Sequence, residues 1–134
     1  ALKEHGIPFD EDRLLHVGFF SSDHGSLATE QLLSCKKPYT AVMYPDDFTA
    51  IAAYRTLARA GLTVGKNISV TGFDGVSIGQ MVEPRLTTIR QNAARIGERA
   101  AQLLLDVIEG TETEERMIRL DTELIEGESV RRLV

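Results

Sequence analysis

The chain has 134 residues, the size of one ordinary domain, of which 43% are hydrophobic and 26% are charged. This composition is that of a globular protein with a normal core, and it excludes a disordered chain. The formal net charge of -5 argues against this segment holding nucleic acid by itself, because a surface that binds phosphates is basic. The chain has no run of about 18 apolar residues, so no membrane span is predicted.

Thiol, imidazole and hydroxyl groups give little sign of chemistry. The single cysteine, Cys35, cannot form an internal disulfide, so nothing points to an oxidising compartment. The histidines His5, His16 and His24 lack the spacing of metal ligands. Ser21-Ser22 lacks the G-x-S-x-G setting of a hydrolase nucleophile. We therefore expect no metal, no cofactor and no enzyme activity.

Short apolar segments alternate with helical ones along the chain. The N-terminal residues resemble the end of a helix that starts in a longer protein. Strands are predicted at 14–20, 39–44 and 67–73, and helices at 26–33, 47–60 and 77–82. An extended segment at 86–90 precedes the longest helix, 93–109, and the last strand candidates are 117–120 and 123–126. Apolar strands separated by helices predict βαβ units and a parallel sheet.

Polar side chains follow the predicted strands where ligands of parallel α/β sheets bind, beyond the carboxyl ends. Asp46, Asp47 and Asp74 present carboxylates that accept hydrogen bonds from hydroxyl groups. Phe20 presents a flat face against which a sugar ring or a base can stack, whereas Phe73 is expected in the core. The alternative for each aspartate is a helix cap or a turn residue, and for Asp47 we favour the cap.

Four ordered motifs strengthen this interpretation: YTAVMYPDDFTAIAA at 39–53, GLTV at 61–64, ISVTGFDG at 68–75 and PRLTTIRQ at 84–91. They resemble the N-D-x-x-A, G-L-x-V-P, I-S-V-x-G-F-D-D and P-x-L-T-T-I-x-Q patterns of the effector domain in the LacI/GalR family of bacterial transcription regulators. Helix 93–109 and the ending at 123–125 also fit, so the resemblance covers nearly the whole chain.

The resemblance implies an α/β fold, a parallel-sheet sandwich that forms the C-terminal subdomain of a periplasmic-binding-protein-like (type I) fold. Residues 1–134 are then the C-terminal portion of an effector-binding domain, with the DNA-binding domain elsewhere. Helix 92–110 is expected to pack on an N-terminal subdomain outside this sequence. Leaving its apolar stripe in water would cost several kcal/mol at about 25 cal/mol per Å². We expect the helix to dock elsewhere on this chain or on a neighbouring one.

The same resemblance implies roles for single residues. Asp74 matches the family's effector-binding aspartate, and Asp46 occupies the place of an effector-binding asparagine. Phe20 aligns with an aromatic that lines the effector pocket, and Gln91 lies on a crossover strand near the cleft. A carboxylate at position 46 favours a cation or a ligand rich in hydrogen-bond donors. Glycines replace a family Pro at position 65 and a family Asp at 75, and both changes are expected to be neutral to the fold.

The implied function is the effector-sensing part of a cytoplasmic LacI-type repressor. A small sugar-like or nucleoside-like molecule would bind, shift the subdomains and so control DNA binding through a domain outside this sequence. Two alternatives stay open: a secreted solute-binding protein of the same fold, and a receiver-like phospho-acceptor domain in which Asp46 and Asp47 hold Mg²⁺.

Helix 51–59 and the segment 77–82 match the dimer-forming surface of the family. An isologous contact in a homodimer would use Ile51, Tyr54, Arg55 and Ala58.

Overall fold

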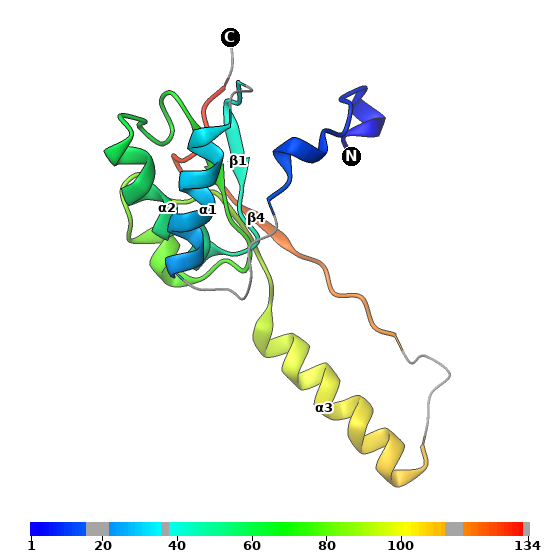
Figure 1. The fold of residues 1–134 in the computed structure, drawn as a ribbon. Coiled ribbons are helices and arrows are strands. Elements are labelled where there is room, and N and C mark those ends of the chain that lie inside the picture. The colour runs from blue at the N-terminus through cyan, green and yellow to red at the C-terminus, as the bar shows by residue number, and fades with distance from the viewer. Residues whose placement is uncertain (16–21, 36–37, 112–116, 133–134) are drawn as a thin grey trace.

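The computed structural model describes residues 1–15, 22–35, 38–111 and 117–132. Helices and strands alternate along them, and one long helix projects from the rest (Figure 1). The elements are η1 (Lys3–His5), η2 (Glu11–Arg13), α1 (Ser22–Ser34), β1 (Ala41–Met43), α2 (Asp47–Arg59), β2 (Ser69–Thr71), η3 (Ser77–Gln80), β3 (Thr88–Arg90), α3 (Ala93–Glu109) and β4 (Glu123–Ile125). Of the helices within the described ranges, none is long and apolar enough to cross a membrane.

Strands β1 and β2 pair in parallel, which confirms the arrangement predicted for 39–44 and 67–73. The chain leading into β3 continues this layer in the same direction, because the amide of Gly72 donates to the carbonyl of Thr87 at 3.1 Å. β3 also pairs with β4 in antiparallel fashion, so the two form a narrow ribbon that leaves the layer. Most of the first predicted strand, 14–20, lies outside the described residues.

The core lies between these strands and α1 and α2, which pack against each other (Figure 1). Its buried members are Tyr44, Ala50, Ala53, Leu57, Val64, Ile68, Val70 and Leu86. The hydroxyl of Tyr44 lies 2.7 Å from Oγ1 of Thr29. Since Thr29 donates its own proton to the carbonyl of Gly25, Tyr44 is the donor to Thr29. Burial raises the pKa of Tyr44 to about 12, which keeps that donor protonated.

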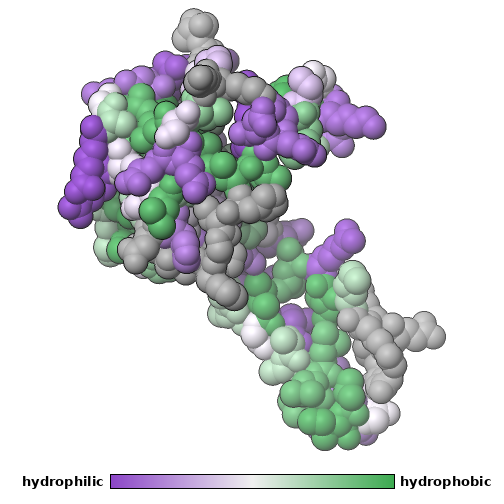
Figure 2. Space-filling view, in the orientation of Figure 1, coloured by the Kyte–Doolittle hydropathy of each residue, from purple (hydrophilic) through white to green (hydrophobic). Residues whose placement is uncertain are grey.

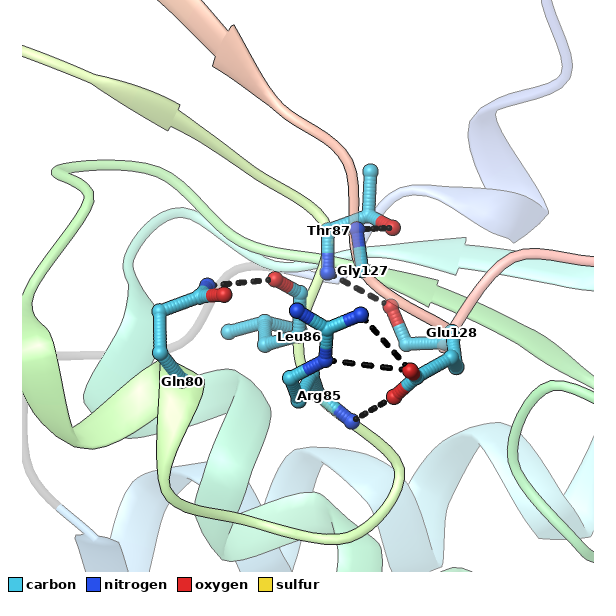
Figure 3. Close-up of polar contacts among 7 residues, drawn as sticks. Gln80, Arg85, Leu86, Thr87, Gly127 and Glu128 are labelled. Atoms are coloured by element: carbon cyan, nitrogen blue, oxygen red, sulfur yellow. Dashed lines mark hydrogen bonds and ion pairs between the residues drawn. The ribbon is translucent and has the colours of Figure 1, made fainter.

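Polar contacts join the C-terminal segment to the loop before β3 (Figure 3). Arg85 donates from Nε at 3.0 Å and from Nη2 at 2.7 Å to one carboxylate oxygen of Glu128, and from its amide at 3.0 Å to the other. These hydrogen bonds hold the pKa of Glu128 below its usual range. Nearby, the buried hydroxyl of Ser129 accepts from the amide of Thr87 at 2.8 Å and donates to the carbonyl of Val70 at 2.6 Å. The ion pair is exposed, so the buried Ser129 bonds contribute more to stability.

The close approach of the C-terminal segment also constrains Gly65. Its φ is +76°, and a Cβ there would collide with the carbonyl oxygen of Glu128. The expectation that a glycine at this position is neutral to the fold is therefore wrong, because the backbone contact requires it.

Of the last two predicted strands, only the second forms. The segment 117–120 has no strand partner within the described ranges, whereas β4 is held by its ladder with β3. An extended segment counts as a strand only when a neighbour takes up its backbone hydrogen bonds.

Helix α3 projects away from the other elements and buries none of its residues (Figure 1). Only Gln91 and Asn92 separate it from β3. Hydrophobic surface gathers on this arm (Figure 2), where Leu104 is 60% and Ile108 is 70% exposed. The expectation that α3 docks elsewhere on this chain is wrong, and docking on a neighbouring polypeptide stays a prediction.

Candidate functional site

Asp74 and Gln91 meet just beyond the carboxyl ends of β2 and β3. The amide of Asp74 donates to the carbonyl of Ile89 at 2.9 Å, and the amide of Gln91 donates to the carbonyl of Asp74 at 3.3 Å. The side chains meet as well, since Nε2 of Gln91 donates to Oδ1 of Asp74 at 2.6 Å. Both are half-buried, so each keeps polar surface that faces outward. The structure thus brings together two of the predicted ligand residues; their binding of a ligand stays a prediction.

The backbone at Asp74 is strained. Its φ is +104°, and no other non-glycine residue in the described part of the chain has a positive φ. Such a conformation costs free energy and persists only where surrounding contacts enforce it, which often marks a functional position. Gly75 follows with φ +71°, so two consecutive left-handed residues turn the chain sharply after the carboxylate.

Asp46 is the N-cap of α2. Its Oδ1 accepts from the amide of Thr49 at 2.9 Å and its Oδ2 accepts from the hydroxyl of Thr49 at 2.5 Å. The interpretation of Asp47 as the cap is therefore wrong. The backbone of Asp46 is extended, with φ −152° and ψ 168°, which is the conformation that an N-cap needs and that a helical residue cannot take. Asp46 is 6% exposed, and its contact with a ligand stays a prediction.

Asp47 is fully buried and bonds to three residues in two other parts of the chain. Its amide donates to the carbonyl of Phe73 at 2.9 Å. Its Oδ2 accepts from the amide of Val76 at 2.7 Å, and its Oδ1 accepts from the hydroxyl of Thr88 at 2.5 Å. Sequence reasoning missed this arrangement, because an Asp-Asp pair after a strand carries no sign of which aspartate turns inward.

Of the two phenylalanines near the predicted site, Phe73 lies within the described residues. Phe20 lies outside the described residues. Phe73 is 38% exposed rather than part of the core, because the strand ends at Thr71 and the turn after it reaches the surface. An aromatic face therefore stands directly before Asp74.

The aspartate carboxylates at this edge of the sheet have no ion-pair partner within the described ranges. Arg90, whose backbone bridges to Asp74, directs Nη1 to Glu123 at 3.4 Å instead. No three His, Cys, Asp or Glu side chains of the described residues gather as a metal site would require. Asp46 and Asp47 also turn to different partners, so they do not present the paired carboxylates that a receiver-like Mg²⁺ site needs.

The four predicted dimer residues separate into two groups. Ile51 and Tyr54 pack against the core of their own chain. Arg55 and Ala58 are exposed on the surface of α2. The resemblance to the family assigned all four to one surface, and the packing of α2 on the core divides them.

A cavity of about 430 Å³ lies between the N-terminal segment and the β1–α1 side. Its lining is mostly apolar and reaches Pro45 after the end of β1, but it includes neither Asp74 nor Gln91.

We predict that Gly75→Ala destabilises the chain more than Gly61→Ala. Both glycines have left-handed backbones, with φ +71° and φ +76°. Nothing lies within 4 Å of a Cβ at Gly61, whereas a Cβ at Gly75 would lie 2.6 Å from Cα of Arg90. Gly61→Ala should cost about 1 kcal/mol from backbone conformation alone, and Gly75→Ala about 2 kcal/mol or more. Urea unfolding measures both, and equal losses would contradict the expectation. The same clash makes Gly75 a requirement of this backbone, not the neutral replacement that was expected.

Comparison with known proteins shows which family the chain matches. Residues 1–130 match the periplasmic binding protein-like domain family. The chain is 37% identical to the probable HTH-type transcriptional repressor ExuR of Bacillus subtilis, over 99% of this chain and 40% of that protein. It is 38% identical to the HTH-type transcriptional repressor CytR of Escherichia coli, over 99% of this chain and 39% of that protein.

Solved structures agree. A transcriptional regulator CelR–cellobiose complex superimposes with a TM-score of 0.89 at 33% identity, over 96% of this chain and 39% of that one. A LacI family regulator from Enterococcus faecium with bound ribose gives a TM-score of 0.83 at 32% identity, over 100% of this chain and 49% of that one. The chain spans 39–40% of the length of the curated relatives named above. It belongs to the periplasmic binding protein-like domain family, in the form that this domain takes in LacI-type transcriptional regulators.

Proposed function

We propose that this chain is the effector-sensing part of a LacI-type transcriptional regulator. It would bind a small sugar-like or nucleoside-like molecule and control, allosterically, the DNA binding of a domain outside these residues. The pairing of Asp74 with Gln91 at two strand ends carries the proposal, because ligands of α/β sheets bind at this edge. Relatives named as repressors, and related structures that hold cellobiose or ribose, support it.

The chemistry of the site supports a ligand that donates hydrogen bonds. Asp74 is a carboxylate without an ion-pair partner in the described part of the chain, and Gln91 adds an amide carbonyl. A ligand hydroxyl or amine would find acceptors here, whereas a carboxylate or phosphate group would meet repulsion. Exposed Phe73 beside the pair offers a face for a sugar ring or base. An acidic group on the ligand would have to be held by another wall of the cleft.

We assign no catalytic role and a cytoplasmic location to the whole protein. The relatives named above are transcription repressors, which favours a regulator over a secreted solute-binding protein of the same fold. Those two classes differ outside the shared domain: a regulator carries a helix-turn-helix domain, and a secreted protein a signal peptide.

The exposed face of α3 supports a second subdomain. Its apolar residues repeat at helical spacing, and the helix buries none of them within this chain. The relatives are longer than this chain, which covers 39–40% of their length. We propose that helix 92–110 packs on an N-terminal subdomain and thereby helps to close the ligand cleft.

The surface of α2 would serve a homodimer. Arg55 and Ala58 stay exposed after the helix has packed on the core. A small residue beside a charged one suits close contact of two copies across a twofold axis. Ile51 and Tyr54 would support that surface from beneath, since they pack against the core.

Ligand binding should depend on Asp74. A thermal-shift screen of sugars, nucleosides and purines on the full-length protein identifies ligands by their stabilisation. Asp74→Ala should weaken binding of each hit by about tenfold or more, because a hydrogen bond to a charged group is lost. Glu30→Ala removes an exposed carboxylate from α1 and is the matched control. Unchanged ligand stabilisation in Asp74→Ala would refute the assignment of Asp74 as a ligand-binding residue.

The apolar face of α3 should matter only in the longer protein. Leu104→Asp should lower the stability of residues 1–134 only through the poorer helix propensity of aspartate, since this side chain is already exposed. In the full-length protein the same change should cost roughly 2 kcal/mol or more, because the leucine would be buried there. Glu98→Asp, on the opposite face, controls for the poorer helix propensity of aspartate. Urea unfolding of both lengths gives the comparison, and equal effects at both lengths would contradict the docking proposal.

The dimer surface predicts a change in molecular mass. Full-length protein should be a dimer by light scattering, and Ala58→Arg should shift it toward the monomer by placing like charges and bulk at the twofold contact. Gln31→Arg, exposed on α1, is the control and should stay dimeric. A wild-type monomer at high concentration would refute the proposal.

A further inference from the structure

Asp47 holds both ends of the turn that carries the strained Asp74, one end through its backbone amide and the other through its carboxylate. Its own amide donates to the carbonyl of Phe73 at 2.9 Å, just before Asp74. Its Oδ2 accepts from the amide of Val76 at 2.7 Å, just after Gly75. One residue at the start of α2 therefore bonds to the first and the last residue of the turn 73–76.

The same carboxylate reaches the strand that leads to Gln91. Oδ1 of Asp47 accepts from the hydroxyl of Thr88, the first residue of β3. Thr88 is 1% exposed and Asp47 is 0% exposed, so water does not compete for this bond. The carboxylate fits because Gly72 leaves room for it: a Cβ at Gly72 would collide with Oδ1 of Asp47.

Burial makes these bonds costly to break. Within the described ranges no lysine or arginine pairs with Asp47, so hydrogen bonds alone stabilise its charge. A buried carboxylate that loses one of them has no water to replace it. Asp47 therefore couples the positions of three segments: the turn 73–76, the start of β3 and the start of α2.

Asp46 does not share this role. Both of its oxygens are engaged by Thr49 within its own helix, and among the described residues its side chain bonds to no other element. The two adjacent aspartates thus divide their tasks: one starts the helix, and the other joins it to the ligand site.

We propose that Asp47 is a positioning residue that sets where Asp74 and Gln91 stand relative to each other and ties their pair to the first turn of α2. This inference rests on the proposed function, in which that pair contacts the ligand. Asp47 itself is closed off from the ligand by its burial. Its effect on binding passes through the backbone of the turn and of β3.

Hydrogen exchange in the full-length protein tests the positioning without any ligand. Thr88→Val removes one donor to the buried carboxylate while keeping the shape of the side chain. Exchange at the amides of Asp74 and Gln91, which donate into the β2–β3 junction, should accelerate by about tenfold relative to the amides of β1 and β2.

Ser129→Ala is the matched control. It also removes a buried hydroxyl that makes two hydrogen bonds, but these hold the amide of Thr87 and the carbonyl of Val70, away from the turn. It should accelerate exchange at Thr87 and leave Asp74 unchanged. If both variants accelerate all amides alike, Asp47 supports only global stability and the proposal is overturned.

A second measurement uses ribose and cellobiose as probes in titration calorimetry. Asp47→Ala and Thr88→Val should each weaken binding of a sugar that the wild type binds by about tenfold. Asp47→Asn should restore most of it, because the amide can accept from Val76 and donate to the hydroxyl of Thr88. Ser129→Ala should bind as the wild type does, even at equal loss of stability. Equal weakening in Ser129→Ala would also overturn the proposal.

The two ideas fail separately. If Asp74→Ala leaves ligand binding intact while Thr88→Val still loosens the turn, the ligand assignment fails and the positioning by Asp47 stands. If Asp74→Ala abolishes binding while Thr88→Val changes neither exchange nor affinity, the ligand assignment stands and the positioning fails.

Discussion

A carboxylate that is closed off from water must keep its hydrogen bonds, and Asp47 meets this constraint by joining three segments that are far apart in sequence. Its partners come from the turn 73–76 and from Thr88, while its own backbone begins α2. Because none of these partners can be lost without leaving a buried charge unsatisfied, the carboxyl end of the sheet has one geometry. The candidate site is built on that end.

The strain at Asp74 follows from this constraint. A left-handed backbone at a non-glycine residue costs free energy, and the turn keeps it because both of its ends are held. Gly75 completes the turn where Arg90 leaves no room for a side chain. Gln91 then lies beside Asp74 because a parallel bridge joins Asp74 to Arg90, the residue before Gln91. The carboxylate of Asp74 and the side-chain amide of Gln91 lie together because the backbone of the turn and of β3 fixes both residues.

Helix α3, unlike the buried contacts around Asp47, is exposed to solvent along its whole length. β3 and β4 form a ribbon that carries α3 away from the core (Figure 1). The helix keeps an apolar face in contact with solvent. Such a face is stable only when something covers it. In the proposed function, a ligand cleft walled on one side by Asp74 and Gln91 would need an opposite wall, and the N-terminal subdomain that supplies it would also cover α3.

Local signals in the sequence predicted α2 and both ends of α3, since capping and periodicity act over a few residues: Asn92 caps α3 and Gly110 ends it, as expected. Ordered motifs also predicted Asp74 and Gln91 as ligand residues, and the structure brings their side chains together. The tertiary structure alone decided which of two adjacent aspartates caps α2 and which is buried. Both residue types suit an N-cap, and only partners from far along the chain give Asp47 an interior to occupy. The placement of α3 was likewise beyond local signals, because an amphipathic pattern states that a face will be covered but not by what.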